Sequence, residues 1–261
     1  MRISKNWDAR VPDAELIARS AGFCALRERI VQLAEPQSGH VVVDVGSGTG
    51  LLALAFAERA ARVWAIDSSP AMNEYLRVKA ISAELDNIEP VLASAVSLPL
   101  VDGIADLVVS NYCMHELRGA EKDRALAEAM RVLKPGGRLV IGDMMFSFNP
   151  MRPRDRHVVA LKLRTLLRRG LPGVFRLLKN AARLASGRGE HPANVVWWRE
   201  ALERSGFHHV KIEVLAHEGG IAVAQAPATG ILPYGSASTE AVPGTRPSEA
   251  SRASAPGVCL R

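Results

Sequence analysis

Three glycines at alternate positions are the clearest chemical signal in the sequence. Gly46, Gly48 and Gly50 follow the apolar run 40–45 and precede an Ala/Leu-rich stretch. Open α/β sheets bind ligands where a strand ends in such a turn, and glycines let a ligand approach the backbone because they carry no Cβ. Asp44 lies two residues before the first glycine. We expect a binding loop here, with an ordinary turn that happens to hold three glycines as the alternative.

The spacing of the glycines and the charge of Asp44 indicate what this loop would bind. The dinucleotide fingerprint GxGxxG places a phosphate at a helix N-terminus. This loop instead reads GxGxG, with Leu51 where the fingerprint needs its last glycine. A carboxylate at Asp44 would repel a pyrophosphate, but it suits a ligand that carries an ammonium and a sulfonium. Charge therefore favours S-adenosylmethionine (SAM) over NAD as the cofactor.

Asp67 supplies a second carboxylate, at the end of the next expected strand and seventeen residues after Gly50. A carboxylate there can accept hydrogen bonds from both hydroxyls of an adenosine ribose, each worth about 1.5–3 kcal/mol. NAD enzymes use the same arrangement, and a solvated helix-capping aspartate would also fit. Asp67 thus indicates a nucleoside without identifying it.

The segment 111–116 (NYCMHE) follows the fourth expected strand and offers groups that could act on a second substrate. Methyl transfer is an in-line displacement in which positioning of the acceptor can contribute about 7–11 kcal/mol. A base is needed only if the acceptor must lose a proton. His115 is the candidate base, with Tyr112 beside it, although a lone histidine here more often caps a helix or packs on the adenine. Cys113 has no base paired with it, and Asp143 could face the pocket or a plain turn.

Alternating strands and helices would position these groups. The run 40–45 is typical of a buried parallel strand, apolar spacing indicates a leading helix over 13–34, and Ser69 is a suitable N-cap. Further strands are expected at 63–67, 89–94, 105–111 and 138–144, and helices at 51–61, 68–85 and 121–134, the last ended by 135–137. The alternation predicts a doubly wound, mainly parallel, Rossmann-like α/β sheet.

A strongly basic segment interrupts this pattern. Residues 151–190 carry eleven Lys or Arg and two acids among many leucines, which predicts two short basic amphipathic helices. We consider three roles for them: a lid over the acceptor, a contact with an anionic membrane surface that delivers a lipid-like acceptor, or nucleic-acid binding. Phe175 is the segment's one aromatic residue, which disfavours stacking on bases.

The remaining chain is expected to close the sheet and then lose structure. Residues 194–205 predict a helix, and 207–214 with 221–226 predict a hairpin. From 227 to 261 the chain is rich in Ala, Pro, Ser, Gly and Thr with few large apolar groups, so we expect disorder.

Composition limits the class of protein. A chain of 261 residues accommodates one α/β domain with additions. The first residues lack the apolar stretch of a secretory signal, and no run of about 18 apolar residues would span a membrane. Three scattered cysteines predict neither a disulfide framework nor a metal site, and they fit the cytoplasm. The net charge of +6 allows an anionic partner without requiring one.

Five stretches follow one another in a characteristic order: VVVDVGSGTG, VWAIDSSPAM, ASAVSLPLVDGIADLVVSNYCMHEL, MRVLKPGGRLVIGDM and WWREALERSGFHHVKI. Together they resemble the class I SAM-dependent methyltransferases, in the small-molecule group that includes the ubiquinone/menaquinone C-methyltransferases. The resemblance covers roughly residues 35–145 and 194–225. It implies a seven-stranded sheet with a reversed last strand. The expected organisation is then an N-terminal helical segment (1–34), a methyltransferase domain (35–226) with the helical insertion 151–190 as a lid, and a disordered tail (227–261).

The resemblance also implies which residues contact SAM. Ser94 stands where the family usually has an acid for the adenine amino group, and a neutral hydrogen bond there would be weaker. Asn111 and Tyr112 match positions at the substrate edge, and an aromatic often stands where this chain has Ala105. The implied contacts are Asp44, Gly46, Ser47, Gly48 and Gly50 for the methionine part, Asp67 for the ribose, and Met72, Ser94 and Ala95 near the adenine, with Ser68 and Asn111 as further cofactor-binding residues.

The expected activity is therefore transfer of the SAM methyl group to a small, hydrophobic or lipid-like acceptor. A nucleic-acid methyltransferase is the first alternative, but the fourth strand ends in SNYC and not in an NPPY-type tetrad. An NAD-type oxidoreductase or a binding module without catalysis is the second. The sequence leaves open whether the acceptor atom is O, N or C, and which oligomer forms.

Overall fold

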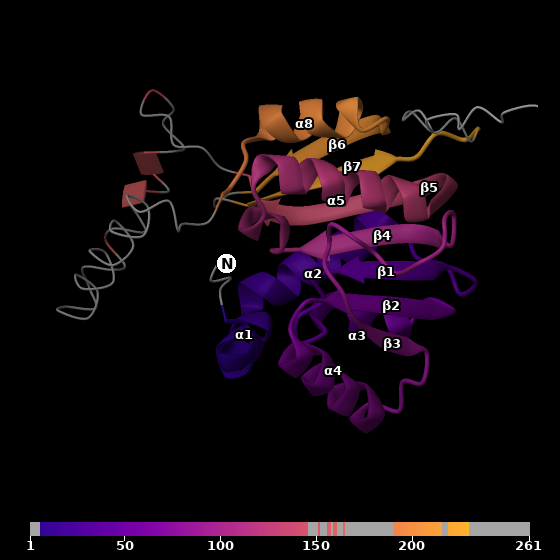
Figure 1. Ribbon diagram of the computed structural model, residues 1–261. Coiled ribbons are helices and arrows are strands. Elements are labelled where there is room, and N and C mark those ends of the chain that lie inside the picture. Colours follow the sequence, from indigo (N-terminus) through magenta and orange to yellow (C-terminus); the bar gives the residue numbers. More distant parts are fainter. Residues whose placement is uncertain are drawn as a thin grey trace, which may run out of the picture. The chain divides into compact units, whose positions relative to one another are not determined.

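The computed structural model contains a seven-stranded sheet between two layers of helices (Figure 1). It describes residues 6–145, 191–215 and 219–229, together with positions 151, 156, 157, 159, 160 and 164. The strands are β1 (Val41–Val45), β2 (Arg62–Asp67), β3 (Ile88–Leu92), β4 (Ala105–Asn111), β5 (Leu133–Met144), β6 (His208–Val214) and β7 (Gly219–Gln225). Their order is β3-β2-β1-β4-β5-β7-β6, and β7 runs antiparallel to both of its neighbours, β5 and β6, whereas the other described strand pairs are parallel. The predicted Rossmann-like sheet with its reversed last strand is confirmed.

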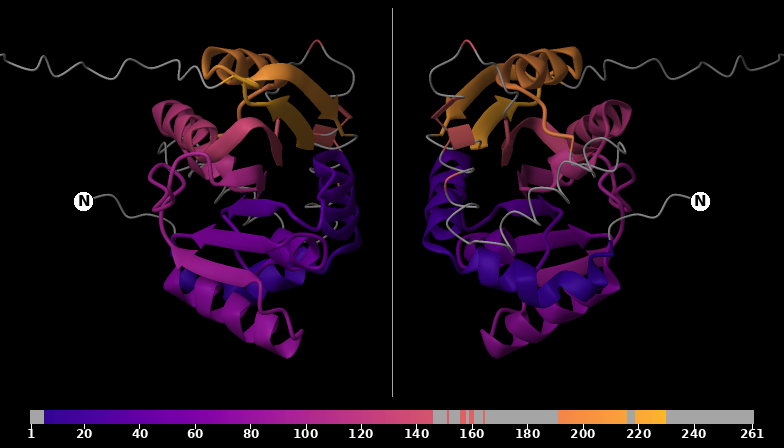
Figure 2. Two further views of the ribbon diagram at one scale, coloured as in Figure 1. Left: turned by 90° about the vertical axis from the view of Figure 1, so that its right-hand side faces the viewer. Right: turned by 90° about the vertical axis from the view of Figure 1, so that its left-hand side faces the viewer.

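Helices cover both faces of this sheet (Figure 2). One face packs against α5 and α8, and the other packs against α2, α3 and α4. Along β1, Val42 faces the second layer and Val43 the first, as the alternation of side chains in a strand requires. The described helices are η1 (Asp8–Arg10), α1 (Val11–Ala18), α2 (Ala21–Ala34), α3 (Leu51–Ala57), α4 (Pro70–Ser82), η2 (Met114–Glu116), α5 (Gly119–Val132) and α8 (Val195–Arg204).

The strand order creates the place where a ligand can bind. The chain winds from β1 toward β2 and β3 on one side, and toward β4 and β5 on the other. The carboxyl ends of β1, β2 and β4 therefore meet at the point where the winding reverses, which is the ligand-binding crevice of open α/β sheets. Asp44, Asp67 and Asn111 all lie at or next to these ends.

Two local predictions need correction. The single helix expected over 13–34 is wrong, because Ser20 has an extended backbone and its Oγ accepts a hydrogen bond from Phe23 N at 3.5 Å, which starts α2 as a separate helix. The fifth strand begins at Leu133 and not at 138. Its pairing with β4 shifts between Ala105 and Leu107, where the Pro-Gly-Gly sequence makes a bulge. The other strands and helices start and end within a few residues of the predicted limits, and Ser69 caps α4 as expected.

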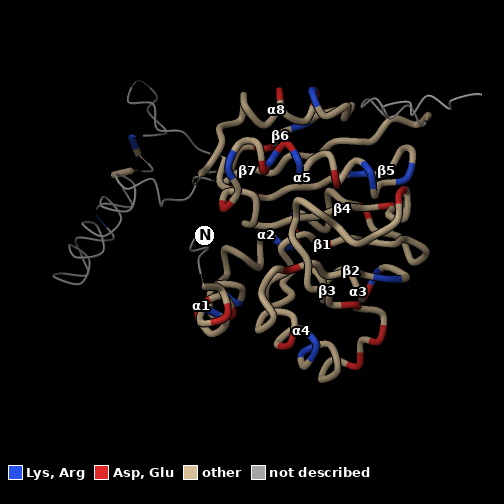
Figure 3. Tube along the Cα trace, in the orientation of Figure 1, with Lys and Arg blue, Asp and Glu red and all other residues tan. Residues whose placement is uncertain are grey.

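Charged side chains of both signs are interspersed around the described elements (Figure 3). No described helix has the length and apolar character needed to cross a membrane. The predicted basic insertion 151–190 and the predicted tail 227–261 lie outside the described residues, apart from the few positions given above and 227–229. Their predicted roles therefore stay predictions.

The fold makes a first prediction at the interface of α5 and the sheet. Leu126 is fully buried there, so Leu126→Ala removes apolar contacts and leaves a cavity that the packed sheet cannot fill. We expect the free energy of unfolding, measured by urea denaturation, to fall by about 2–5 kcal/mol. The control is Ile81→Ala on α4, whose side chain is 71% exposed. An equal loss in both variants would contradict this account of the core.

Candidate functional site

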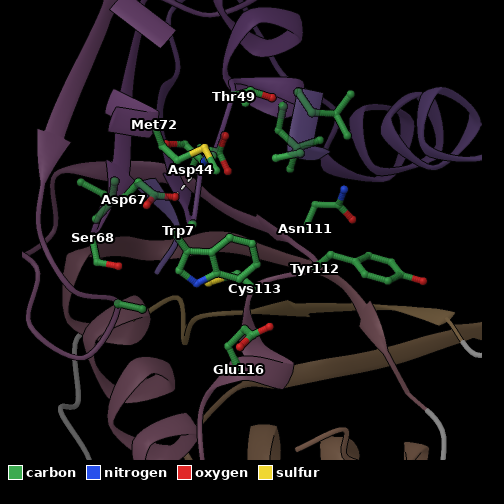
Figure 4. Close-up of a pocket in the computed structure, with 18 of the residues that line it drawn as sticks. Trp7, Asp44, Thr49, Asp67, Ser68, Met72, Asn111, Tyr112, Cys113 and Glu116 are labelled. Atoms are coloured by element: carbon green, nitrogen blue, oxygen red, sulfur yellow. Dashed lines mark hydrogen bonds between the residues drawn. The ribbon is translucent and has the colours of Figure 1, made fainter. Parts of the chain in front are cut away.

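A cavity of about 650 Å³ lies at the carboxyl ends of β1, β2 and β4 (Figure 4). Every predicted cofactor or catalytic residue except Gly50 lines it. The residues concerned are Asp44, Gly46, Ser47, Gly48, Asp67, Ser68, Met72, Ser94, Ala95, Asn111, Tyr112 and His115. The structure thus brings together groups that are far apart in the sequence.

The glycine loop needs its glycines for two different reasons. Gly46 has a φ of 74°, and a Cβ on it would lie 2.3 Å from Cys113 Sγ, so any larger residue clashes with the segment after β4. Gly48 has a φ of 52°, but its α-carbon faces open space in the cavity, where a Cβ would meet no atom within 4 Å. Gly50 (φ 89°) lies outside the cavity lining and instead lets α3 start against Leu76 of α4.

Asp44 is a buried carboxylate with an unsatisfied oxygen. Its residue is 1% exposed, and its Oδ2 has no hydrogen-bond partner among the described residues. Burial raises the pKa of Asp44 to about 7; a backbone N–H opposes this rise, and the charge of Asp67 adds to it. A buried carboxylate oxygen without a partner is costly. The site is therefore built to receive a hydrogen-bond donor, and a cationic donor would suit it best.

Asp67 ties the glycine loop to the start of α4. Its Oδ2 accepts from Gly48 N at 2.9 Å, and its Oδ1 accepts from Ser69 N at 2.9 Å. Burial raises the pKa of Asp67, while these backbone N–H groups lower it. Each oxygen keeps a lone pair for a further donor. A ligand with two adjacent hydroxyls could therefore bind this carboxylate without disturbing the loop.

His115 and aromatic side chains form the other end of the cavity. His115 Nδ1 lies 2.6 Å from Asp143 Oδ1, and its Nε2 lies 3.5 Å from Glu116 Oε1. The Tyr112 ring meets the His115 ring edge-on, with centroids 5.8 Å apart, and packs against Phe23 at 4.9 Å. Tyr112 is held at a φ of 50°, a left-handed conformation that is uncommon for a bulky residue.

The partners of His115 decide its charge. Burial lowers its pKa, but the hydrogen bonds and negative charges of Asp143 and Glu116 outweigh burial and raise the pKa to about 9. The imidazole is thus protonated near neutral pH and donates hydrogen bonds, so a histidine acting as a base in the ligand-free site is disfavoured. Asp143 is itself 1% exposed and does not line the cavity; it lies behind His115 and orients the ring.

Two other chemical assignments find no support. Burial raises the pKa of the Cys113 thiol, so it is a poor nucleophile. Tyr75 and Lys79 on α4 have the Tyr-x-x-x-Lys spacing of some oxidoreductases, but neither side chain lines the cavity. Lys79 donates instead to Glu15 and to the Thr49 carbonyl.

The N-terminal segment contributes to the cavity in a way that was not predicted from the sequence. Trp7, Arg10, Asp13 and Ile17 line the cavity together with Ala14, Ala18 and Phe23. In Figure 4 the Trp7 indole projects into the space shared by Asp67, Cys113 and Glu116. An isolated tryptophan among polar residues was the only sequence signal, because helical spacing does not say what a helix packs against.

Comparison with known proteins agrees with this geometry. Residues 43–141 match the family described as "Methyltransferase domain". The chain is 36% identical over 130 residues to a demethylmenaquinone methyltransferase of Thermobifida fusca. The aligned region covers 50% of this chain and 53% of the relative. A demethylmenaquinone methyltransferase of Thermus thermophilus is 37% identical over 135 residues, with 50% and 60% covered. The chain thus spans just over half the length of these relatives.

A solved structure shares the fold. A SAM-dependent methyltransferase from Aquifex aeolicus superposes with a TM-score of 0.55 at 20% identity, over 76% of this chain and 88% of that one. At this identity the likeness supports the architecture of the sheet and its helices only.

The ion pair between His115 and Asp143 should make the stability of the protein depend on pH. The folded pKa of His115 of about 9 lies above its ordinary value of 6.5, so its contribution to stability is complete below pH 6.5 and is lost as the pH rises toward 9. We expect the free energy of unfolding of the wild type to fall by about 3 kcal/mol over this range relative to that of His115→Gln. Urea denaturation at successive pH values measures both. If the free energies of unfolding of the two proteins changed in parallel with pH, the raised pKa of His115 would be wrong.

Proposed function

We propose that this chain binds SAM in the cavity and transfers its methyl group to a small-molecule acceptor, a proposal supported by the match of residues 43–141 to a methyltransferase-domain family. The observation that carries the proposal is the pair of carboxylates at the ends of β1 and β2. Asp44 has a buried oxygen in need of a donor, and Asp67 has lone pairs left after fixing the glycine loop. SAM carries both complements, an ammonium on its methionine part and two adjacent hydroxyls on its ribose.

Other residues of the cavity fit the same ligand. Gly48 leaves room for the methionine part against the backbone, and Met72, which is 1% exposed, gives the adenine an apolar surface. Ser94 has its carbonyl bonded by Ser97 N at 3.0 Å and its hydroxyl by Val96 N at 3.4 Å. Because the Ser94 hydroxyl carries no charge, a hydrogen bond between it and the adenine would be weaker than one to an acid.

The acceptor would lie at the end formed by Phe23, Tyr112 and His115. When bound, SAM would supply an electrophilic methyl group, whose carbon the acceptor would attack while the sulfonium sulfur leaves with the bonding electrons. The chain supplies a flat aromatic wall and a protonated histidine. We infer that the acceptor binds as its oxyanion, after its proton has been released to solvent, and that His115 Nε2 donates a hydrogen bond to that oxygen and stabilises its negative charge.

An aromatic, hydroquinone-like acceptor suits this chemistry. The relatives named demethylmenaquinone methyltransferases make a quinone derivative the first compound class to test. In the view of Figure 3, Lys and Arg are interspersed with Asp and Glu on the described elements, which gives nucleic acid no particular support. Asp44 disfavours the pyrophosphate of NAD.

Calorimetry tests the cofactor. We expect SAM to bind and NAD not to bind, and Asp67→Asn to weaken SAM binding by about 10–100-fold, since it loses charge-assisted bonds worth about 1.5–3 kcal/mol. Asp86→Asn, on an exposed loop, is the matched control and should bind SAM like the wild type. Binding of NAD in preference to SAM would overturn the proposal.

An activity assay with labelled SAM and a reduced naphthoquinone tests the acceptor end. We expect His115→Gln to lower kcat by about 10²–10³-fold while the Kd for SAM stays unchanged, because His115 would contact the acceptor and not the cofactor. His208→Gln, at an exposed position on β6, is the control. If His115→Gln weakened SAM binding and left kcat intact, the assigned role would be wrong.

A further inference from the structure

The N-terminal segment 6–18, which we call the strap, is attached to the protein at two points beside the cofactor half of the cavity. At one end, Asp8 Oδ1 accepts from Ser69 Oγ at 2.5 Å and from Ala71 N at 3.2 Å. These groups belong to the start of α4, immediately after Asp67 and Ser68. The first end of the strap therefore lies beside the proposed ribose site.

The second end of the strap reaches the glycine loop. Glu15 of α1 is 8% exposed and accepts from Lys79 Nζ at 3.0 Å, while the same ammonium donates to the Thr49 carbonyl at 2.9 Å. Lys79 thus joins α1, α4 and the loop that follows Gly48. Figure 1 shows α1 beside α4, in agreement with their contacts. The strap lines the cavity through Trp7, Arg10, Asp13, Ala14 and Ile17, and Arg10, Asp13 and Ala14 lie between the two anchors.

The acidic groups of the cavity wall suit the positive charges of the proposed cofactor but not its carboxylate. Its described lining contains the carboxylates of Asp13, Asp44, Asp67 and Glu116, which suit an ammonium, a sulfonium and ribose hydroxyls. The methionine part of SAM also carries a carboxylate. Among the described lining residues the cations are His115, already bound to Asp143, and Arg10. No acid in the described part of the chain forms an ion pair with Arg10.

We propose that Arg10 binds the carboxylate of the cofactor's methionine part, which makes the strap a component of the cofactor site. This inference rests on the proposed function. A guanidinium forms paired, charge-assisted hydrogen bonds with a carboxylate. The anchors at Asp8 and Glu15 hold Arg10 in the wall before the ligand arrives, so little ordering is required on binding.

Two ligands that differ in the amino-acid part test this assignment by calorimetry on the full chain. S-adenosylhomocysteine has the carboxylate, and 5′-methylthioadenosine lacks the whole amino-acid end. We expect Arg10→Met to weaken binding of S-adenosylhomocysteine by about 10-fold or more and to leave binding of 5′-methylthioadenosine unchanged. Arg10→Lys should lose less than Arg10→Met, because it keeps the charge but not the planar donor pair.

The controls separate this inference from the proposed function. Arg27→Met, on α2 with its side chain paired to Glu28, should bind both ligands like the wild type. Equal weakening of both ligands in Arg10→Met, or weakening of neither, would overturn the role of Arg10 while SAM binding by the wild type stands. Failure of the wild type to bind S-adenosylhomocysteine and SAM would instead reject the proposed function, and the role of Arg10 with it.

Discussion

The buried carboxylate of Asp44 is the constraint on which the site depends. β1 lies between β2 and β4, and its valines are buried on both faces, so the end of this strand is shielded from water. An unpaired oxygen there destabilises the empty protein. The extensive core of the surrounding sheet offsets that cost. A cationic donor that bound Asp44 would supply the missing hydrogen bond, and this would favour binding. Sites of this kind sacrifice some stability for affinity.

Hydrogen bonds from neighbouring strands give this carboxylate a fixed setting. The N–H groups of Gly46 and Ser47 donate to the Ile66 carbonyl at 2.8 and 3.0 Å, and Ser110 Oγ donates to the Val45 carbonyl at 2.7 Å. Asp67 then holds the loop through Gly48 N. The loop is thus attached to β2 and β4 at several points. Rigid positioning of this sort lowers the ordering that a ligand must impose.

The sequence allowed much of this arrangement to be predicted, and the reason is that its determinants are local. A valine run followed by GxGxG identifies a strand, a turn and a helix within eleven residues, and Asp67 could be placed from the end of the next strand. Long-range partners were not predictable. Nothing near His115 in the sequence indicates that Asp143, 28 residues away, lies behind it, and helical spacing could not show that Arg10 and Trp7 reach the cavity. The break at Ser20 was missed because apolar spacing continues through it.

The close approach of Gly46 to Cys113 couples the two ends of the cavity. A Cβ at position 46 would overlap the Cys113 side chain, and residue 113 belongs to the same short turn as Tyr112 and His115. A larger residue at position 46 would therefore require the turn to shift, which would also move the aromatic wall. The residue types that fit at position 46 are thus limited by the turn that carries Tyr112 and His115, at the opposite end of the cavity.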